Sequence, residues 1–248
     1  MDRIAVTINT GHCATVASCI ASNKRHLVQE LEIIGPYQCR YDDETIRKMC
    51  NCINEEGVRS GGQLEVLDLS NAEIMDSCNG IYKTNVGSFW SSNSLKDAIT
   101  LRKIIFGRSL ESFFGRDVSR CISLERIEIV DNPLYKSING VLYQYAKKWT
   151  TPALIHFNDG EWILIKVPAA IQDSSLIKFD KINRIESNAF EDTRLRSLTM
   201  PAVPPICDPS AFGSQDLFMI KLFVPKDSFN SYWSHPIWGQ FDIQIIKD

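Results

Sequence analysis

The sequence predicts a mixed α/β fold in which short parallel strands recur as repeats along the chain. Two observations support this prediction. The pattern apolar-x-x-apolar-x-apolar occurs seven times in the 248 residues, and successive copies are in places almost evenly spaced, as from Leu101 to Leu124 and from Leu195 to Met219. Repeats determine the whole architecture, so we consider them before single motifs. The copies begin at Val28, Leu64, Leu101, Leu124, Trp162, Leu195 and Met219.

Each copy has the periodicity of a strand with one buried face. In the copy that begins at Leu64, Leu67 and Leu69 are two positions apart, so both side chains point to the same side of a strand. Spacings of 23 to 24 residues lie within the roughly 20 to 29 residues of a leucine-rich repeat. We therefore expect an irregular leucine-rich-repeat solenoid, whose coils stack because one coil cannot bury its own apolar face. A degenerate copy is expected around residues 176–185.

The front of the chain is expected to cap this solenoid, with residues 1–63 forming an N-terminal helical cap. A helix is predicted from Asp42 to Ile53, because residues 46, 49, 50 and 53 are apolar at helical spacing and Asp42 or Asp43 can serve as N-cap. A second helical stretch is expected at about 13–25. Gly35-Pro36 is predicted to end the first strand with a turn.

The solenoid is predicted to occupy residues 64–218 of one continuous domain, with a hairpin insertion around 134–168. Asn139-Gly140 and Asn158-Asp159-Gly160 are turn sequences that favour such a hairpin. Asn132 stands where the buried asparagine of a repeat would bond backbone groups between coils. Residues 219–248 are predicted to form a C-terminal cap, in which Trp233, Trp238 and Phe241 make a hydrophobic lid or, alternatively, a ligand platform.

Composition excludes several classes of function. The chain has 27 Lys and Arg residues against 30 Asp and Glu residues, and its sequence has no stripe of basic residues. Nucleic-acid binding is therefore not indicated. No apolar run approaches the roughly 18 residues of a membrane span, so no membrane insertion is expected. The first residues, Met1 to Thr7, lack the apolar segment of a secretory signal, so either the protein stays inside the cell or a signal was removed. The eight cysteines are expected to be mainly buried thiols, with one or two disulfides as the alternative.

Motifs for enzymatic chemistry are lacking in the sequence. Neither a phosphate-binding glycine loop, a nucleophile elbow nor a His-Glu-x-x-His zinc motif occurs, so we expect no enzyme and no cofactor. An unrecognised hydrolase remains a third hypothesis. His12 next to Cys13 is interpreted as locally bonded or solvent-facing rather than catalytic. The acidic runs 42–44 and 55–56 are interpreted as a helix start and solvated surface rather than a calcium site.

Four stretches of the chain resemble the BspA-like leucine-rich-repeat proteins of anaerobic bacteria. They are Leu31-Glu-Ile-Ile-Gly-Pro36 with Leu64 to Ile74, Ile185-Glu-Ser-Asn-Ala-Phe190, Asn139 to Tyr143 followed by Leu164 to Ala169, and Leu222-Phe-Val-Pro225 with Tyr232, Trp238 and Phe241. The usual insertion of that family is a tight hairpin, whereas about twenty residues, 144–163, separate its halves here. The resemblance implies a cell-surface or secreted bacterial protein that binds proteins or other macromolecules, although a cytoplasmic location stays open.

The residues between the apolar positions of each copy should point outward and line up on the exposed sheet. This mixed-charge stripe suits an unknown protein partner of complementary charge, although a solvated face without a ligand is an equal alternative. Its residues are Glu65, Asp68, Arg102, Lys103, Glu125, Arg126, Glu128, Arg196 and Thr199. The alternative function is a carbohydrate-binding module that stacks a glycan on exposed rings of Trp90, Trp149 or Trp162.

Overall fold

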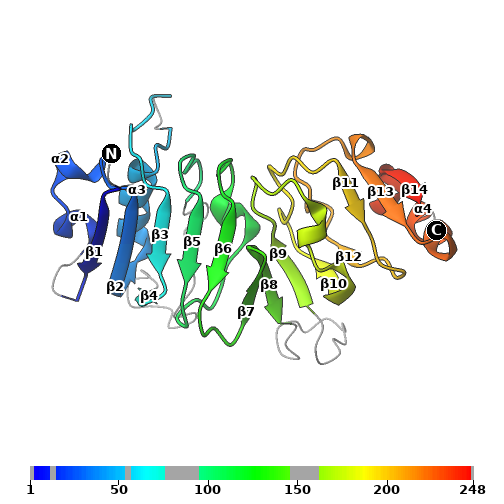
Figure 1. Ribbon diagram of the computed structural model, residues 1–248, viewed down its shortest axis with the longest axis horizontal. Coiled ribbons are helices and arrows are strands. Elements are labelled where there is room, and N and C mark those ends of the chain that lie inside the picture. The colour runs from blue at the N-terminus through cyan, green and yellow to red at the C-terminus, as the bar shows by residue number, and fades with distance from the viewer. Residues whose placement is uncertain (1–2, 12–14, 54–56, 76–94, 146–161, 247–248) are drawn as a thin grey trace. The chain divides into compact units, whose positions relative to one another are not determined.

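The computed structural model describes residues 3–11, 15–53, 57–75, 95–145 and 162–246, and shows a mixed α/β chain with several parallel strands and few helices (Figure 1). It forms two compact units, Met1–Leu134 and Tyr135–Asp248. The sequence predicted one continuous domain with boundaries after residues 63 and 218. The division of the structure falls inside the predicted solenoid instead, at the start of the expected hairpin.

The first unit is built on a parallel sheet in the order β1-β2-β3-β5-β6. Its strands are β1 Ala5–Asn9, β2 Glu30–Gln38, β3 Val66–Leu69, β5 Lys103–Phe106 and β6 Arg126–Ile129. Leu31, Leu67, Ile104 and Ile127 pair in one register across the sheet, and each is at most 1% exposed. Four of the predicted copies thus form one parallel sheet with the predicted apolar residues inward. β1 was not predicted.

Strand β2 changes partner at Gly35 instead of ending there. Its first half pairs with β1 and β3, and from Gly35 to Gln38 it pairs with β4, Ala72–Met75. Gly35 has a φ of 87°, a conformation that favours glycine and that lets the strand bend without leaving the ladder. The prediction that Gly35-Pro36 ends the strand is therefore wrong.

The helices of the first unit are α1 Val16–Cys19, α2 Ser22–Arg25 and α3 Cys39–Met49. The expected helix at 13–25 is thus two short ones, and α3 begins and ends earlier than predicted. Ile46, Met49 and Cys50 are buried as expected. Asp42 is not the N-cap, because its buried carboxylate accepts the backbone N–H of Gln38 at 2.9 Å and of Val16 at 2.8 Å. It joins α1 to the start of α3.

The solvated-surface interpretation of the first acidic run is wrong for two of its members. Asp42 and Asp43 are at most 4% exposed, and the Tyr37 hydroxyl donates to Asp43 Oδ1 at 2.7 Å. Glu44 is exposed and pairs with Lys48 at 2.7 Å. Residues 54–56, which include the second acidic run, lie outside the described residues.

Two features hold neighbouring loops of the first unit together. Asn132 Nδ2 donates to the carbonyls of Gly107 at 2.9 Å and Leu110 at 2.8 Å, while its Oδ1 accepts the Leu134 N–H at 2.8 Å. This confirms the role predicted for Asn132. A Cβ atom on Gly107 would lie 2.0 Å from the Ser70 carbonyl oxygen, so the two turns approach this closely only because glycine has no side chain.

The second unit opens with the predicted hairpin, formed by β7 Tyr135–Ile138 and β8 Val141–Tyr145. Asn139 and Gly140 have positive φ of 54° and 83°, as the tight primed turns of hairpins require. β8 pairs antiparallel with β9 Trp162–Lys166, which continues in parallel to β10 Ile182–Ile185 and β12 Ile206–Cys207. Strand β10 confirms the degenerate copy expected at 176–185. Residues 146–161 lie outside the described residues.

A separate parallel sheet completes the second unit, with the strand order β11 Ser197–Thr199, β13 Lys221–Val224 and β14 Asp242–Ile245. Helix α4, Phe229–Trp233, contacts β14. Short 3-10 helices connect the elements of both units: η1 Gly115–Val118, η2 Ser174–Leu176, η3 Phe179–Lys181, η4 Leu217–Met219, η5 Lys226–Ser228 and η6 Trp238–Gln240. Trp238 and Phe241 are buried, as expected of the lid, but Trp233 is 63% exposed. Met219 is also exposed, and Ile220 takes its predicted place in the core.

The core of the second unit contains a run of stacked aromatic rings. Phe190 stacks on Phe212 with ring centroids 4.6 Å apart and an interplanar angle of 2°, and Phe179 lies on its other side at 6.3 Å. Ala189 and Phe190 are both 0% exposed, which agrees with the interior position that the resemblance implied. The rings fill the space between successive turns and so contribute much of the buried apolar area.

One lysine of the second unit is buried where the repeat pattern predicts an outward residue. Lys166 is 1% exposed, and its amine donates to the carbonyls of Asn188 and Glu191 at 3.0 Å each. Ile163 and Leu164, also predicted to point outward, are buried too. Strand β9 is buried on both faces, so the copy that begins at Trp162 does not have one solvated side.

The described cysteines support the prediction of buried thiols. Cys50, Cys52 and Cys207 are buried thiols outside any disulfide. Burial raises the pKa of the Cys50 thiol well above its usual value, and raises that of Cys207 to about 12. Cys121 is buried and donates to the Leu95 carbonyl at 3.0 Å. These side chains behave as small core residues.

Candidate interaction face

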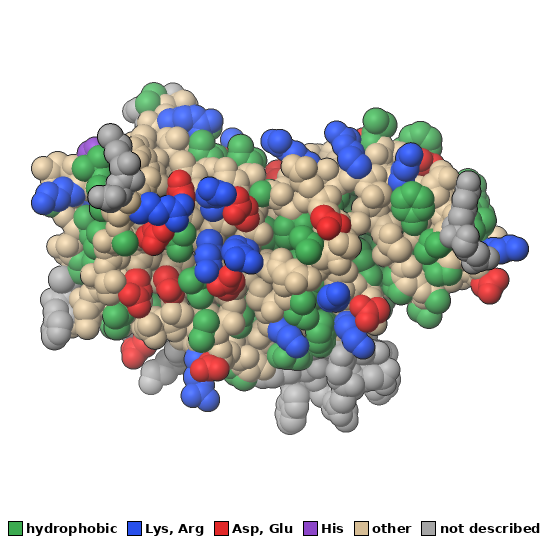
Figure 2. Space-filling view, in the orientation of Figure 1, with side chains coloured by type: hydrophobic (Ala, Val, Ile, Leu, Met, Phe, Trp, Pro, Cys, Tyr) green, Lys and Arg blue, Asp and Glu red, His purple; other side chains and the backbone are tan. Residues whose placement is uncertain are grey.

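The solvent side of the first sheet carries the main cluster of charged side chains. We define the interaction face as the outward-pointing residues of β2, β3, β5 and β6, together with residues that come just before β3, β5 and β6. They are Glu30, Glu32, Glu65, Val66, Asp68, Arg102, Lys103, Ile105, Glu125, Arg126 and Glu128. Figure 2 shows acidic and basic side chains interleaved over β3, β5 and β6.

Ion pairs order the half of this face that lies over β5 and β6. Arg102 pairs with Glu125 at 2.5 Å and Lys103 with Glu128 at 2.8 Å, so each pair joins two neighbouring strands. The hydrogen bond and charge of Glu125 raise the pKa of Arg102 above its ordinary value. Exposed pairs of this kind contribute about 0 to 1 kcal/mol each, so they favour these side-chain positions without fixing them.

The half of the face over β2 and β3 has an excess of acid. Glu32 and Asp68 are direct register partners on the two strands, and within the described residues neither has an ion pair. Glu32 accepts from the Thr7 hydroxyl at 2.9 Å, and Asp68 accepts from the Ser70 N–H at 2.8 Å. Like charges side by side on a sheet are unfavourable. A cationic group from outside would therefore be stabilised at this position.

Half-buried apolar residues lie between the two charged halves. Val66 and Ile105 point outward from β3 and β5, and Ile105 has Asp68 and Glu128 as its register partners on either side. Arg3 closes the other margin of the face by pairing with Glu30 and Glu65, each at 2.7 Å. Two half-buried apolar residues on neighbouring strands thus stand among charged side chains.

The predicted stripe is not continuous along the chain. Seven of its nine residues, Glu65 to Glu128, come together on the interaction face. Arg196 and Thr199 are exposed, as expected, but they belong to the second unit, at or next to β11 of a different sheet. These two residues therefore do not belong to the sheet that carries the other seven, because the hairpin β7–β8 interrupts the succession of parallel strands.

Among the tryptophans proposed to stack a glycan, the structure describes Trp162, and its ring is not fully accessible to solvent. Trp162 is half-buried, with Tyr143 at 5.5 Å and Tyr145 at 6.5 Å between ring centroids. The Lys136 amine lies 4.9 Å from the Trp162 ring centroid. A sugar would have to displace this contact in order to stack. Trp90 and Trp149 lie outside the described residues.

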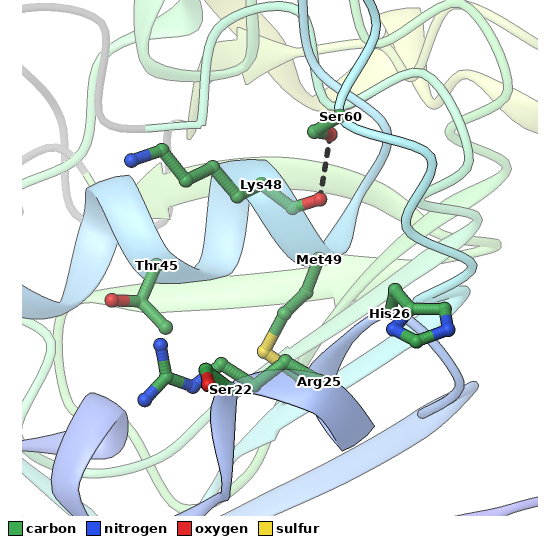
Figure 3. Close-up of a pocket in the computed structure, with 7 residues that line it drawn as sticks. All are labelled: Ser22, Arg25, His26, Thr45, Lys48, Met49 and Ser60. Carbon is green, nitrogen blue, oxygen red and sulfur yellow. Dashed lines mark hydrogen bonds between the residues drawn. The ribbon is translucent and has the colours of Figure 1, made fainter.

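A pocket of about 210 Å³ lies between α2, α3 and the segment around Ser60 (Figure 3). Arg25, His26 and Lys48 line it, but their charged groups do not converge. The Arg25 guanidinium donates to the carbonyls of Ala17 and of Ile20, and the Lys48 amine pairs with Glu44 and points away from Arg25 and His26 in Figure 3. The pocket is therefore a polar gap between elements rather than an assembled site.

Two further titratable groups with a shifted pKa, Asp117 and His235, have structural partners. Burial raises the pKa of Asp117 to about 7, although its carboxylate accepts the Phe114 N–H at 2.9 Å. His235 Nδ1 accepts the N–H groups of Ile237 at 3.2 Å and Trp238 at 3.3 Å, and burial lowers its pKa. His12, Cys13 and His156 lie outside the described residues.

The described residues contain no group of three or more His, Cys, Asp or Glu side chains placed to hold a metal ion. Their helices are all too short or too polar to cross a bilayer.

Comparisons with known proteins assign no family. No protein-family model matches the sequence, and no curated protein matches it. A solved structure of a leucine-rich cell surface protein from Faecalibacterium prausnitzii A2-165 is similar with 13% identity and a TM-score of 0.35; the match covers 90% of this chain and 55% of that one. The chain thus spans about half the length of this neighbour, and a likeness of this size does not establish a shared function. Membership of the BspA-like family stays a prediction.

Proposed function

We propose that the protein is a non-catalytic module that binds a partner protein through the interaction face. The observation that carries the proposal is the arrangement of that face: the half-buried Val66 and Ile105 point outward on neighbouring strands, and charged side chains in cross-strand ion pairs surround them. Protein interfaces commonly place their energetically important residues in a centre that a polar rim shields from water.

The charges of the face define the kind of partner. The Glu32–Asp68 pair favours a lysine or arginine of the partner, whereas Arg102, Lys103 and Arg126, already paired within the face, keep N–H donors for further acidic groups. A uniform polyanion fits only the second set, so a protein of mixed charge is the better match.

A finer assignment goes with this proposal. We infer that the stacked strands β2, β3, β5 and β6 are leucine-rich repeats of a solenoid, since they keep one register and Asn132 bonds the turns between two of them. We also infer a BspA-like protein of the bacterial cell surface or secreted fraction, with a role in adhesion or interaction.

The test uses a photo-crosslinking residue at position 105. The protein is incubated with extracellular and cell-surface protein fractions, irradiated and analysed for crosslinked species by mass spectrometry. We expect a reproducible partner whose capture is lost in the charge-reversed variant R102E/K103E/R126E. Undiminished capture by that variant, or no partner in either fraction, would refute the proposal.

The matched control reverses three exposed charges of the second unit. K178E/K181E/K226E changes the net charge by the same amount but leaves the interaction face intact. It should capture the partner as the wild type does. Equal loss in both variants would mean that overall charge, and not this face, governs binding.

A further inference from the structure

A second pocket, of about 270 Å³, lies in the second unit between the chain leading into β11 and the chain around η4. Arg194, Leu195 and Arg196 line one side of it, and Asp216, Met219 and Ile220 line the other. It lies outside the interaction face, and two residues of the core, Leu195 and Ile220, form part of its lining. Figure 2 shows basic and apolar side chains next to one another above β11 and β13.

The cationic side of the pocket consists of two arginines that alternate with a buried leucine. Arg194 and Arg196 are exposed and Leu195 is 3% exposed, so both guanidinium groups project to the solvent side of the same extended segment. In the part of the chain that the structure describes, neither arginine has an ion pair or a side-chain hydrogen bond. This contrasts with Arg102 and Arg126, which are paired. Guanidinium groups bind carboxylates well because two parallel N–H donors match two oxygens.

The opposite side of the pocket is apolar and unusually exposed. Met219 is 61% and its neighbour Phe218 is 68% exposed, although Met219 occupies a position that the repeat pattern assigns to the core. Ile220, 4% exposed, forms the floor with Leu195. A methionine side chain is flexible and polarizable, so it adapts to apolar groups of different shape.

One acidic side chain also lines the pocket. The Asp216 carboxylate accepts the Phe218 N–H at 3.2 Å and so caps η4, the short helix that carries Phe218 and Met219. Its negative charge offsets the positive charge of one arginine, so the pocket lining keeps a net positive charge. Asp216 therefore positions the apolar rim while the arginines determine the sign of the ligand.

We propose that this pocket binds an acidic peptide segment of a partner protein, in which a carboxylate lies next to a large apolar side chain. The carboxylate meets Arg194 and Arg196, and the apolar side chain rests on Met219 above Leu195 and Ile220. Charge complementarity favours this occupant over a basic or purely apolar segment. The inference goes beyond the proposed function, because it concerns a different unit and a different surface.

The experiment measures fluorescence anisotropy with two labelled peptides, Gly-Ser-Glu-Leu-Glu-Gly-Ser and its analogue with phenylalanine for leucine. We expect saturable binding that weakens as NaCl rises, since the contacts are exposed charges. R194Q and R196Q should each weaken binding about tenfold, the order expected for loss of one charge-assisted hydrogen-bonding partner. M219S should weaken it by a factor of about three to ten, because it removes the apolar contact.

Two controls separate the possible outcomes. K226Q removes an exposed charge from the same unit outside the pocket and should leave the affinity unchanged. A third peptide, with serine in place of the leucine, keeps both carboxylates but loses the apolar side chain, so it should bind more weakly. Equal binding of that serine peptide overturns the proposal, as does the lack of saturable binding by both probes up to about 1 mM.

A further variant separates this proposal from the proposed function. R102E/K103E/R126E alters the interaction face alone and must retain the peptide, because the pocket is lined by residues of the second unit. Loss of peptide binding in that variant would also overturn the proposal.

Discussion

Replacing Asp117 by asparagine should make the protein more stable at neutral and alkaline pH and change how its stability depends on pH. Asp117 is 1% exposed in η1, and its one carboxylate bond to the Phe114 N–H does not compensate for burial. Burial is the largest cause that raises the pKa of this carboxyl from 3.8 to about 7, and the nearby charge of Asp43 adds to it, while Arg116 opposes it. The side-chain amide introduced by D117N keeps an oxygen for the Phe114 N–H without carrying a charge.

The sign follows from which state binds the proton more tightly. Because the folded protein holds the proton up to about pH 7 and the unfolded chain releases it near 3.8, the contribution of this group to stability is full below pH 4 and falls as the pH rises to about 7. Each pKa unit corresponds to about 1.4 kcal/mol, so the difference of about three units gives an upper value of about 4 kcal/mol. Water that reaches the carboxylate lowers this value. We therefore expect the free energy of unfolding of D117N, relative to the wild type, to increase by about 2 to 4 kcal/mol between pH 4 and pH 8.

The assay is urea denaturation followed by circular dichroism at pH 4, 5, 6, 7 and 8 for the wild type and D117N. The free-energy difference between the two should grow up to about pH 7 and then stay level. E111Q, which removes an exposed carboxyl from the same unit, should follow the wild type at every pH. A constant difference between D117N and the wild type would refute the reasoning, since it would mean that Asp117 is already ionised at low pH in the folded protein.

Three further substitutions test the packing of the two units. N132A should destabilise the first unit by about 1 to 3 kcal/mol in urea titrations, because the Gly107, Leu110 and Leu134 backbone groups lose their partner; a change below about 0.5 kcal/mol would contradict this. K166M should destabilise the second unit by a similar amount although methionine is apolar, since two buried carbonyls lose their donor; equal or greater stability than wild type would be the contrary result. F190A should lower the free energy of unfolding by about 3 to 5 kcal/mol, measured against V203A at an exposed site, and equal effects would disprove the stacked core.

The strands of the first sheet could be predicted because their apolar residues obey one period. The buried positions of β3 and β5 are all apolar: Leu67 and Leu69 in β3, and Ile104 and Phe106 in β5. Each strand and its inner face therefore follow directly from the pattern. Asn132 was also identifiable, as a polar residue at a position fixed by the repeat. Strand β1 was missed because its sequence, Ala-Val-Thr-Ile-Asn, does not complete the pattern.

Prediction failed where tertiary contacts decide the role of a residue. Lys166 has the outward position of its copy, but the strand is covered on both sides and the amine finds two backbone carbonyls. Asp42 has the sequence of an N-cap and instead accepts the N–H of Gln38, four residues earlier, and that of Val16, 26 residues earlier. The Val16 N–H and the carbonyls that bond Lys166 are not visible from local sequence.

The site was predicted in part for the same reason. The seven face residues of β3, β5 and β6 come together because outward positions in a continuous ladder must align. Arg196 and Thr199 do not join them, since the sequence does not show that the ladder stops at the hairpin. The pocket beside Met219 was not predicted, because the pattern placed that methionine inside.

The constant register of β3, β5 and β6 has a consequence for how this surface can vary. Val66 pairs with Lys103 and Lys103 with Arg126, yet the first step takes 37 residues along the chain and the second only 23. Length changes in the return segments therefore do not shift the outward side chains relative to one another. Natural variants can acquire insertions behind the sheet while their recognition chemistry stays the same, and an engineer can shorten those segments independently of the charges that select a partner.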